Sequence, residues 1–286
     1  MFMIIEIIKT IFYGIIEGIT EWLPVSSTGH LILFEELFWK ETNPDFMEMF
    51  RVVIQLGAIL AVIIMFFNKL NPFSKCKDKL AKRNTWEMWV KVIIACLPAA
   101  VIGLPFDEKL DSVFYNFITV AVTLIVYGII FVVIESVKRK EPRINDISEL
   151  SYKTSLLIGA FQLLALIPGT SRSGITIIGA MLLGCSRTVA AEFSFFLAIP
   201  VMFGASLLKC VNYAKDIVDG EVAMISSSEG IILAVGMVVA FAVSMLAINF
   251  LMEYVKKRSF KPFGYYRIVL GIILLVYYLV FERGVA

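Results

Sequence analysis

Long apolar runs alternate with short polar loops along most of the chain. Crossing the apolar core of a bilayer takes about 20 apolar residues, with a range of roughly 17–25. Six runs reach or approach this length, at about 51–67, 91–106, 117–136, 190–208, 230–252 and 264–281. The run at 91–106 is the shortest that we count. The pattern therefore predicts an all-α integral membrane protein with six transmembrane helices.

Two further apolar stretches are interrupted near their centres. The stretch at 3–38 is broken by PVSSTG at 24–29, and the stretch at 154–184 is broken by PGTSRSG at 168–174. Proline, glycine and clustered hydroxyls end one helix and cap the next. Non-helical backbone persists at membrane depth only where it is buried in protein or lines a polar cavity. Each stretch is therefore predicted to form a re-entrant helix–turn–helix hairpin.

The two broken stretches are similar to each other. Residues 14–27 contain G-x-x-E and then L-P-x-S-S, and residues 159–171 contain G-x-x-Q and then I-P-x-T-S, which aligns Ser27 with Ser171. Lys and Arg gather in the loops at 68–91, 137–153 and 253–262, and they are scarce at 40–50, 107–116 and 209–229. Loops rich in Lys and Arg are cytoplasmic. The first hairpin therefore starts outside and the second inside, and both termini are predicted to lie outside.

This opposed orientation indicates inverted repeats. We expect one membrane domain, 1–286, built from two interlocked repeats at about 1–116 and 150–286, with their polar turns close together near the midplane. Hydrophobic residues make up 59% of the 286 and charged residues 17%, against roughly 45–50% and about 25% in soluble domains. No polar stretch is long enough for a soluble domain. The basic residues stand in short clusters, which argues against nucleic-acid binding.

Two acidic residues, Glu17 and Glu21, lie inside the first broken stretch. Four residues apart, they share one helix face. A charged group in the bilayer costs roughly 2.5–3.5 kcal/mol on insertion scales, so either these carboxylates reach water at the interface or they have a function. Two neighbouring carboxylates suit an acid–base pair or a hard divalent cation such as Mg²⁺ or Ca²⁺.

Hydroxyl residues and a histidine follow Pro24. Ser26, Ser27 and Thr28 suit a simple helix cap, and a helix N-terminus also attracts phosphate. His30 is the only histidine in the chain. A lone histidine is more often structural, but its place beside the hydroxyl turn favours a base or a nucleophile.

The second turn contains Arg172. Arginine at bilayer depth faces a cavity or a partner, and guanidinium binds phosphate oxygens through paired donors. An ion pair with a Glu of the other repeat is the alternative, and the two states can alternate as substrate comes and goes. The combined set predicts a phosphate pocket in which Ser27 or His30 attacks phosphorus. A midplane pocket reached from the bilayer suits a lipid-tailed phosphate.

Residues 17–30 (EGITEWLPVSSTGH) and 168–174 (PGTSRSG) resemble the two signatures of the undecaprenyl-diphosphate phosphatases, also called bacitracin resistance proteins. Residues 53–62 and 191–195 extend the similarity to nearly the whole chain. Members of this family hydrolyse undecaprenyl diphosphate to the monophosphate carrier of cell-wall (peptidoglycan) synthesis, and bacitracin sequesters the same substrate. The resemblance implies a multi-pass enzyme of the bacterial plasma membrane. It also implies a divalent cation and an active site open to the outer side.

The resemblance also implies residue roles. Glu17 and Glu21 would be metal-linked acid–base residues, Ser27 and His30 are competing nucleophile candidates, and Arg172 would bind phosphate. Supporting donors would be Ser26, Thr28, Ser171 and Ser173. Arg51 departs from the family pattern, which has an acid at this place, and it changes the charge near the outer mouth. The oligomeric state stays open, a homodimer included.

Two other functions compete with hydrolysis. Inverted repeats with broken helices are typical of transporters, so a flippase for the lipid phosphate fits the pattern too. Transport, however, needs neither a nucleophile nor an acid–base pair. An anion channel with Arg172 as its filter ranks last, because Glu17 and Glu21 in the pathway would repel anions.

Overall fold

The computed structural model describes residues 2–39, 43–103, 113–114, 116–137 and 141–282. These residues form helices and loops, and they contain no strand beyond an isolated bridge between Ile144 and Cys185. Six helices are long and apolar enough to cross a membrane, at Pro44–Met65, Lys79–Gly103, Phe117–Ser136, Arg187–Val218, Ser227–Lys257 and Lys261–Val280. The prediction of an all-α membrane protein with six transmembrane helices is confirmed.

The first part of the chain forms the following elements: α1 (Phe2–Thr20), α2 (Ser27–Phe38), α3 (Pro44–Val53), α4 (Gln55–Met65), α5 (Phe67–Leu70), α6 (Lys79–Pro98) and the π-helical turn η1 (Ala99–Gly103). The rest forms α8 (Phe117–Ser136), η2 (Ile147–Glu149), α9 (Tyr152–Gln162), η3 (Leu163–Leu166), α10 (Arg172–Leu182), α11 (Arg187–Val218), α12 (Ser227–Lys257), α13 (Lys261–Tyr277) and η4 (Tyr278–Glu282).

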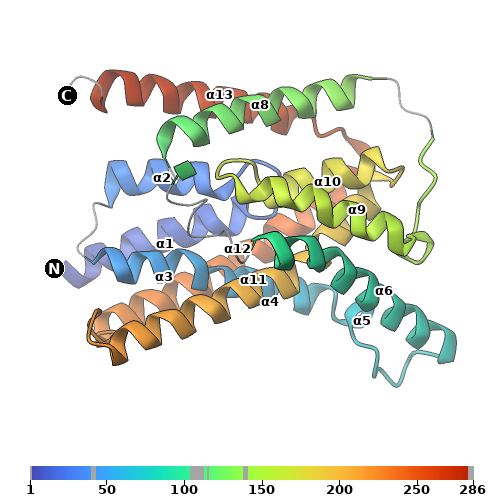
Figure 1. Ribbon diagram of the computed structural model, residues 1–286, viewed down its shortest axis with the longest axis horizontal. Coiled ribbons are helices and arrows are strands. Elements are labelled where there is room, and N and C mark those ends of the chain that lie inside the picture. The colour runs from blue at the N-terminus through green and yellow to red at the C-terminus, as the bar shows by residue number, and fades with distance from the viewer. Residues whose placement is uncertain (1, 40–42, 104–112, 115, 138–140, 283–286) are drawn as a thin grey trace.

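Both interrupted stretches fold as helix, turn and helix. The first consists of α1 and α2, and the second of α9, η3 and α10. In Figure 1 the first hairpin runs inward from the end where the N-terminus lies, and the second runs inward from the opposite end. Their turns come together in the middle of the molecule. Re-entry of these hairpins into a bilayer and the division into repeats at about 1–116 and 150–286 stay predictions.

Each turn ends in a serine with left-handed backbone. Ser26 has a φ of 72° and Ser171 a φ of 71°, and they are the only described non-glycine residues with positive φ. This backbone is uncommon for residues with a side chain and is retained mainly at functional sites. Each serine caps the next helix, since Ser26 Oγ lies 3.5 Å from the nitrogen of Gly29 and Ser171 Oγ 3.1 Å from that of Gly174.

These caps correct the alignment of the two turns. Ser26 is equivalent to Ser171, so the pairing of Ser27 with Ser171 is wrong by one residue. The second turn has one more residue between its proline and its cap than the first. Ser27 and Arg172 therefore occupy the same position, the first residue of a helix.

The two halves of the chain interlock through close helix pairs. Helix α1 packs against α12, and α9 packs against α6. A Cβ atom on Gly159 would lie 2.1 Å from the carbonyl oxygen of Ala95 in α6, and one on Gly57 would lie 2.1 Å from that of Met237 in α12. Small residues allow such close approach between membrane helices. The second hairpin and α4 are thus held in place by helices of the other half.

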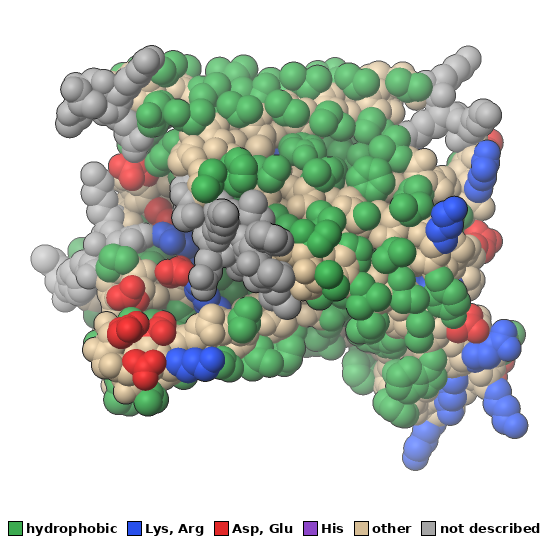
Figure 2. All heavy atoms as spheres, viewed as in Figure 1, with side chains coloured by type: hydrophobic (Ala, Val, Ile, Leu, Met, Phe, Trp, Pro, Cys, Tyr) green, Lys and Arg blue, Asp and Glu red, His purple; other side chains and the backbone are tan. Residues whose placement is uncertain are grey.

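Charged side chains concentrate at the two ends of the molecule. In Figure 2 Lys and Arg project from the end where α5 and α6 meet, and Asp and Glu gather at the opposite end, where both termini lie in Figure 1. Exposed apolar side chains cover the surface between them, and Leu246 (71%) and Val238 (66%) of α12 are examples. This distribution is that of a protein that crosses a bilayer several times.

Candidate active site

The two turns surround a cavity of about 190 Å³. The first turn lines it with Glu21, Ser26, Ser27 and Thr28, and the second lines it with Ser171, Arg172 and Ser173. The backbone brings these residues together because each turn caps a helix whose N-terminus begins at the cavity. Such N-termini favour anions. An apolar part of the wall is formed by Ala165, Val201, Met202 and Ala205.

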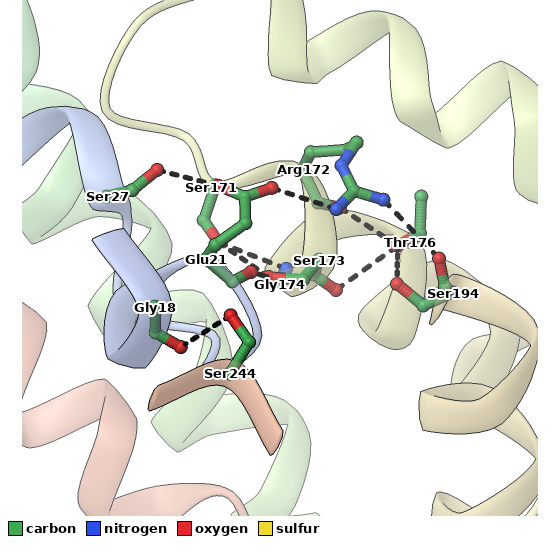
Figure 3. A network of polar contacts seen from close by, with 10 residues as sticks. All are labelled: Gly18, Glu21, Ser27, Ser171, Arg172, Ser173, Gly174, Thr176, Ser194 and Ser244. Carbon is green, nitrogen blue, oxygen red and sulfur yellow. Dashed lines mark hydrogen bonds and ion pairs between the residues drawn. The ribbon is translucent and has the colours of Figure 1, made fainter. Parts of the chain in front are cut away.

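One carboxylate joins the two halves of the chain at this cavity. Oε1 of Glu21 accepts a hydrogen bond of 2.9 Å from Nη2 of Arg172, and Oε2 accepts one of 2.8 Å from Oγ of Ser27 (Figure 3). The side chains of Glu21 and Arg172 are only 9% and 13% exposed. The ion pair is the alternative that the sequence left open for Arg172. A hydroxyl held by a carboxylate is the arrangement of a nucleophile with its base.

Neighbouring polar groups hold Arg172 and Glu21 in position. Oγ1 of Thr176 donates to the carbonyl oxygen of Arg172 at 2.9 Å and lies 2.6 Å from Oγ of Ser194. Oγ of Ser173 donates to the carbonyl oxygen of Glu21 at 3.0 Å (Figure 3). These contacts hold the backbone of Arg172, at the start of α10, and of Glu21, directly after α1, which suits a preorganised site.

Glu17 lies one helical turn before Glu21 and does not line the cavity. Its side chain is fully buried, and neither carboxylate oxygen has a hydrogen-bond partner within the described chain. No cluster of three or more His, Cys, Asp or Glu occurs among the described residues. Mg²⁺ is commonly held by one or two carboxylates, with water and substrate phosphates completing the shell. The oxygens of Glu17 are thus available for a ligand, while both oxygens of Glu21 accept hydrogen bonds, from Arg172 and from Ser27.

His30 is separated from this cluster. Its Nδ1 lies 2.7 Å from the carbonyl oxygen of Ser26, and its Nε2 lies 2.6 Å from the hydroxyl of Tyr266, with the two rings stacked. A carbonyl only accepts, so Nδ1 carries the hydrogen and Nε2 of the neutral ring accepts from Tyr266. The histidine does not line the cavity. Of the two nucleophile candidates, only Ser27 is brought together with Glu21 and Arg172.

Sequence reasoning missed Arg267, which is fully buried in α13. Its Nη2 donates to the carbonyl oxygens of Gly169 at 2.9 Å and Thr170 at 2.8 Å, and its Nη1 lies 3.4 Å from that of Pro24. One guanidinium thus binds the backbone of both turns. The available signal was an arginine inside the apolar run at 264–281, since such residues have a function by default.

Arg51, the departure from the family pattern, is also paired. Its Nε and Nη2 donate to the two carboxylate oxygens of Glu35 at 2.9 and 2.8 Å. The hydroxyl of Tyr13 donates to the same carboxylate at 2.7 Å. The positive charge expected near the outer mouth is therefore balanced by Glu35.

Fold and site together define a multi-pass membrane protein with a pocket between its two turns, lined by hydroxyls, an arginine and one carboxylate. The family model of the bacitracin resistance protein BacA matches residues 10–273, and the chain belongs to this family. It is 60% identical to an undecaprenyl-diphosphatase of Acetivibrio thermocellus over 277 residues, and this alignment covers 96% of this chain and 98% of the relative. An undecaprenyl-diphosphatase of Enterococcus faecalis is 59% identical over 273 residues, which is 95% of this chain and 97% of the relative.

Proposed function

We propose that the protein hydrolyses undecaprenyl diphosphate to undecaprenyl phosphate and inorganic phosphate, which returns the lipid carrier to cell-wall synthesis. The observation that carries the proposal is the carboxylate of Glu21, which binds the hydroxyl of Ser27 and the guanidinium of Arg172 in one cavity. Family membership and relatives named undecaprenyl-diphosphatase support the same activity.

In this proposal the terminal phosphate of the lipid binds between the two turns. Arg172 exchanges the carboxylate of Glu21 for phosphate oxygens, which guanidinium binds through paired hydrogen bonds. The N-termini of α2 and α10 add backbone donors and their positive dipole ends. Hydroxyl donors that line the same cavity are Ser26, Thr28, Ser171 and Ser173.

Ser27 is the proposed nucleophile and Glu21 the proposed base. Oγ of Ser27 attacks the terminal phosphorus while its proton passes to Glu21, and the bond from phosphorus to the bridging oxygen breaks. Undecaprenyl phosphate leaves and takes up that proton. Water then attacks the phosphoserine, Glu21 accepts a proton from this water and passes it to Oγ of Ser27, and inorganic phosphate is released. Arg172 offsets the charge that develops on the phosphoryl oxygens.

We also propose that Glu17 and Glu21 hold a divalent cation, Mg²⁺ or Ca²⁺. When bound, such an ion supplies positive charge that neutralises the diphosphate. The protein would lie in the bacterial plasma membrane with its site open to the outer side. The Lys and Arg side chains that project from the end opposite to the termini support this orientation, because such residues favour the cytoplasmic side.

Metal removal tests this proposal. We expect purified wild type in detergent to release phosphate from farnesyl or undecaprenyl diphosphate with Mg²⁺ or Ca²⁺. Phosphate release should stop in EDTA and recover when excess cation is added. The cation should also raise the unfolding temperature of wild type but not of Glu17→Gln, because a ligand that binds only the folded state stabilises it. Full activity after exhaustive EDTA treatment would disprove the cation site. No release with any cation would disprove the phosphatase.

A further inference from the structure

Gln55 lines the catalytic cavity from α4, an element outside both hairpins. It is the first residue of α4, directly after the break at Ile54 that separates α3 from α4. The rest of the cavity wall is formed by the two turns, by Thr20 and by apolar residues of η3 and α11. Gln55 thus faces the proposed phosphate site from a transmembrane helix that belongs to neither hairpin.

The backbone around Gln55 is held from two sides. On one side, Oγ of Ser206 in α11 donates to the carbonyl oxygen of Val52 at 2.9 Å. On the other, Gly57 lies so close to α12 that a Cβ atom would meet the carbonyl oxygen of Met237. The preceding residue, Ile54, is fully buried. The backbone from which the Gln55 side chain projects is therefore fixed by packing.

The amide of Gln55 has no hydrogen-bond partner among the residues that the structure describes. No side-chain hydrogen bond joins it to any other described residue, although Glu21, Ser27, Ser173 and Arg172 in the same cavity are all hydrogen-bonded. A half-buried amide in a polar cavity has two N–H donors for a ligand. The ligand of this cavity under the proposed function is a diphosphate, whose oxygens are acceptors only.

We propose that Gln55 is a substrate-binding residue whose Nε2 donates a hydrogen bond to a phosphate oxygen of the lipid diphosphate. The inference rests on the proposed function and adds a residue to it. The amide is neutral, so it leaves the charge balance of Glu21 and Arg172 unchanged. It neither carries nor accepts the transferred proton. Its contribution therefore falls on substrate binding rather than on bond cleavage.

Steady-state kinetics of Gln55→Leu test this role. A hydrogen bond to a charged group accounts for roughly a 10- to 100-fold effect on binding. We expect KM for farnesyl diphosphate to rise by about this factor while kcat stays within about twofold, the pattern of a lost ground-state contact. Inhibition by added inorganic phosphate should weaken in the same proportion. Gln55→Glu keeps the shape but places a negative charge near the phosphate, so its KM should rise further.

The matched control is Gln162→Leu. Gln162 is the only other glutamine in the chain, and it is buried in α9 without lining the cavity. We expect the KM of the Gln162→Leu protein and its inhibition by phosphate to equal those of wild type. Unfolding temperatures in detergent identify any variant that is misfolded, and Gln55→Glu then provides the comparison if Gln55→Leu fails to fold.

An unchanged KM and phosphate inhibition in a folded Gln55 variant would overturn the inference. So would a fall in kcat without a change in KM, since that result places Gln55 outside substrate binding. Failure of the proposed function looks different, because wild type itself would then release no phosphate.

Discussion

Ser27→Ala is expected to lower kcat for phosphate release by on the order of 10³-fold or more. The variant lacks the hydroxyl that lies 2.8 Å from Oε2 of Glu21 in the cavity, and the α2 N-terminus and Arg172 stay in place. Substrate binding should therefore change little, and the loss should appear in kcat. Single-turnover release of phosphate from undecaprenyl diphosphate measures this step directly.

His30→Gln is the comparison that separates the two nucleophile candidates. The ring of His30 supports the carbonyl of Ser26 and contacts Tyr266, so its loss should disturb the turn and reduce activity less than Ser27→Ala does. Acid quench of wild type during turnover should trap labelled phosphate as acid-stable phosphoserine at Ser27. An active Ser27→Ala protein, or label that is lost in acid because it was bound to histidine, would contradict the assignment.

Arg267→Met is expected to destabilise the protein by about 3 kcal/mol or more. The substitution removes the donors for the buried carbonyl oxygens of Pro24, Gly169 and Thr170, and each unsatisfied buried acceptor costs about 1–3 kcal/mol. Since these carbonyls belong to both turns, the geometry between Glu21 and Arg172 should loosen as well. Thermal unfolding in detergent and phosphate release should therefore fall together.

Arg258→Met provides the control for this effect. Arg258 is an exposed arginine beyond the end of α12, and surface substitutions of this kind change stability by no more than about 0.5 kcal/mol. An Arg267→Met protein that unfolds at the same temperature as Arg258→Met would show that the buried guanidinium does not hold the turns.

Much of the site could be predicted from the sequence because polar residues are conspicuous in apolar stretches. Glu21 and Arg172 are charged residues inside such stretches, and the cost of placing them in a bilayer implied a cavity or a partner. Ser27 was indicated by the hydroxyl turn that follows Pro24. The caps at Ser26 and Ser171 follow from the same turns, but their left-handed backbone and equivalence do not, because an insertion of one residue is invisible without coordinates.

Long-range contacts were beyond sequence reasoning. His30 was expected to join the cluster because it lies beside the hydroxyl turn, yet its ring contacts Tyr266, 236 residues away. Gln55 and Arg267 lie within apolar runs that were counted simply as spans. Only the structure shows that Gln55 of α4 lines the cavity and that Arg267 of α13 binds both turns.

The most direct test of the proposed phosphatase compares phosphate release from undecaprenyl diphosphate by wild type and Glu21→Gln, both purified and supplied with Mg²⁺ or Ca²⁺. We predict that wild type releases one phosphate per lipid and that the rate of release falls on the order of 10³-fold in Glu21→Gln. The introduced amide is no base for the proton of Ser27 and carries no charge to form an ion pair with Arg172. Wild type that binds the lipid but releases no phosphate would contradict the enzyme and favour a lipid transporter.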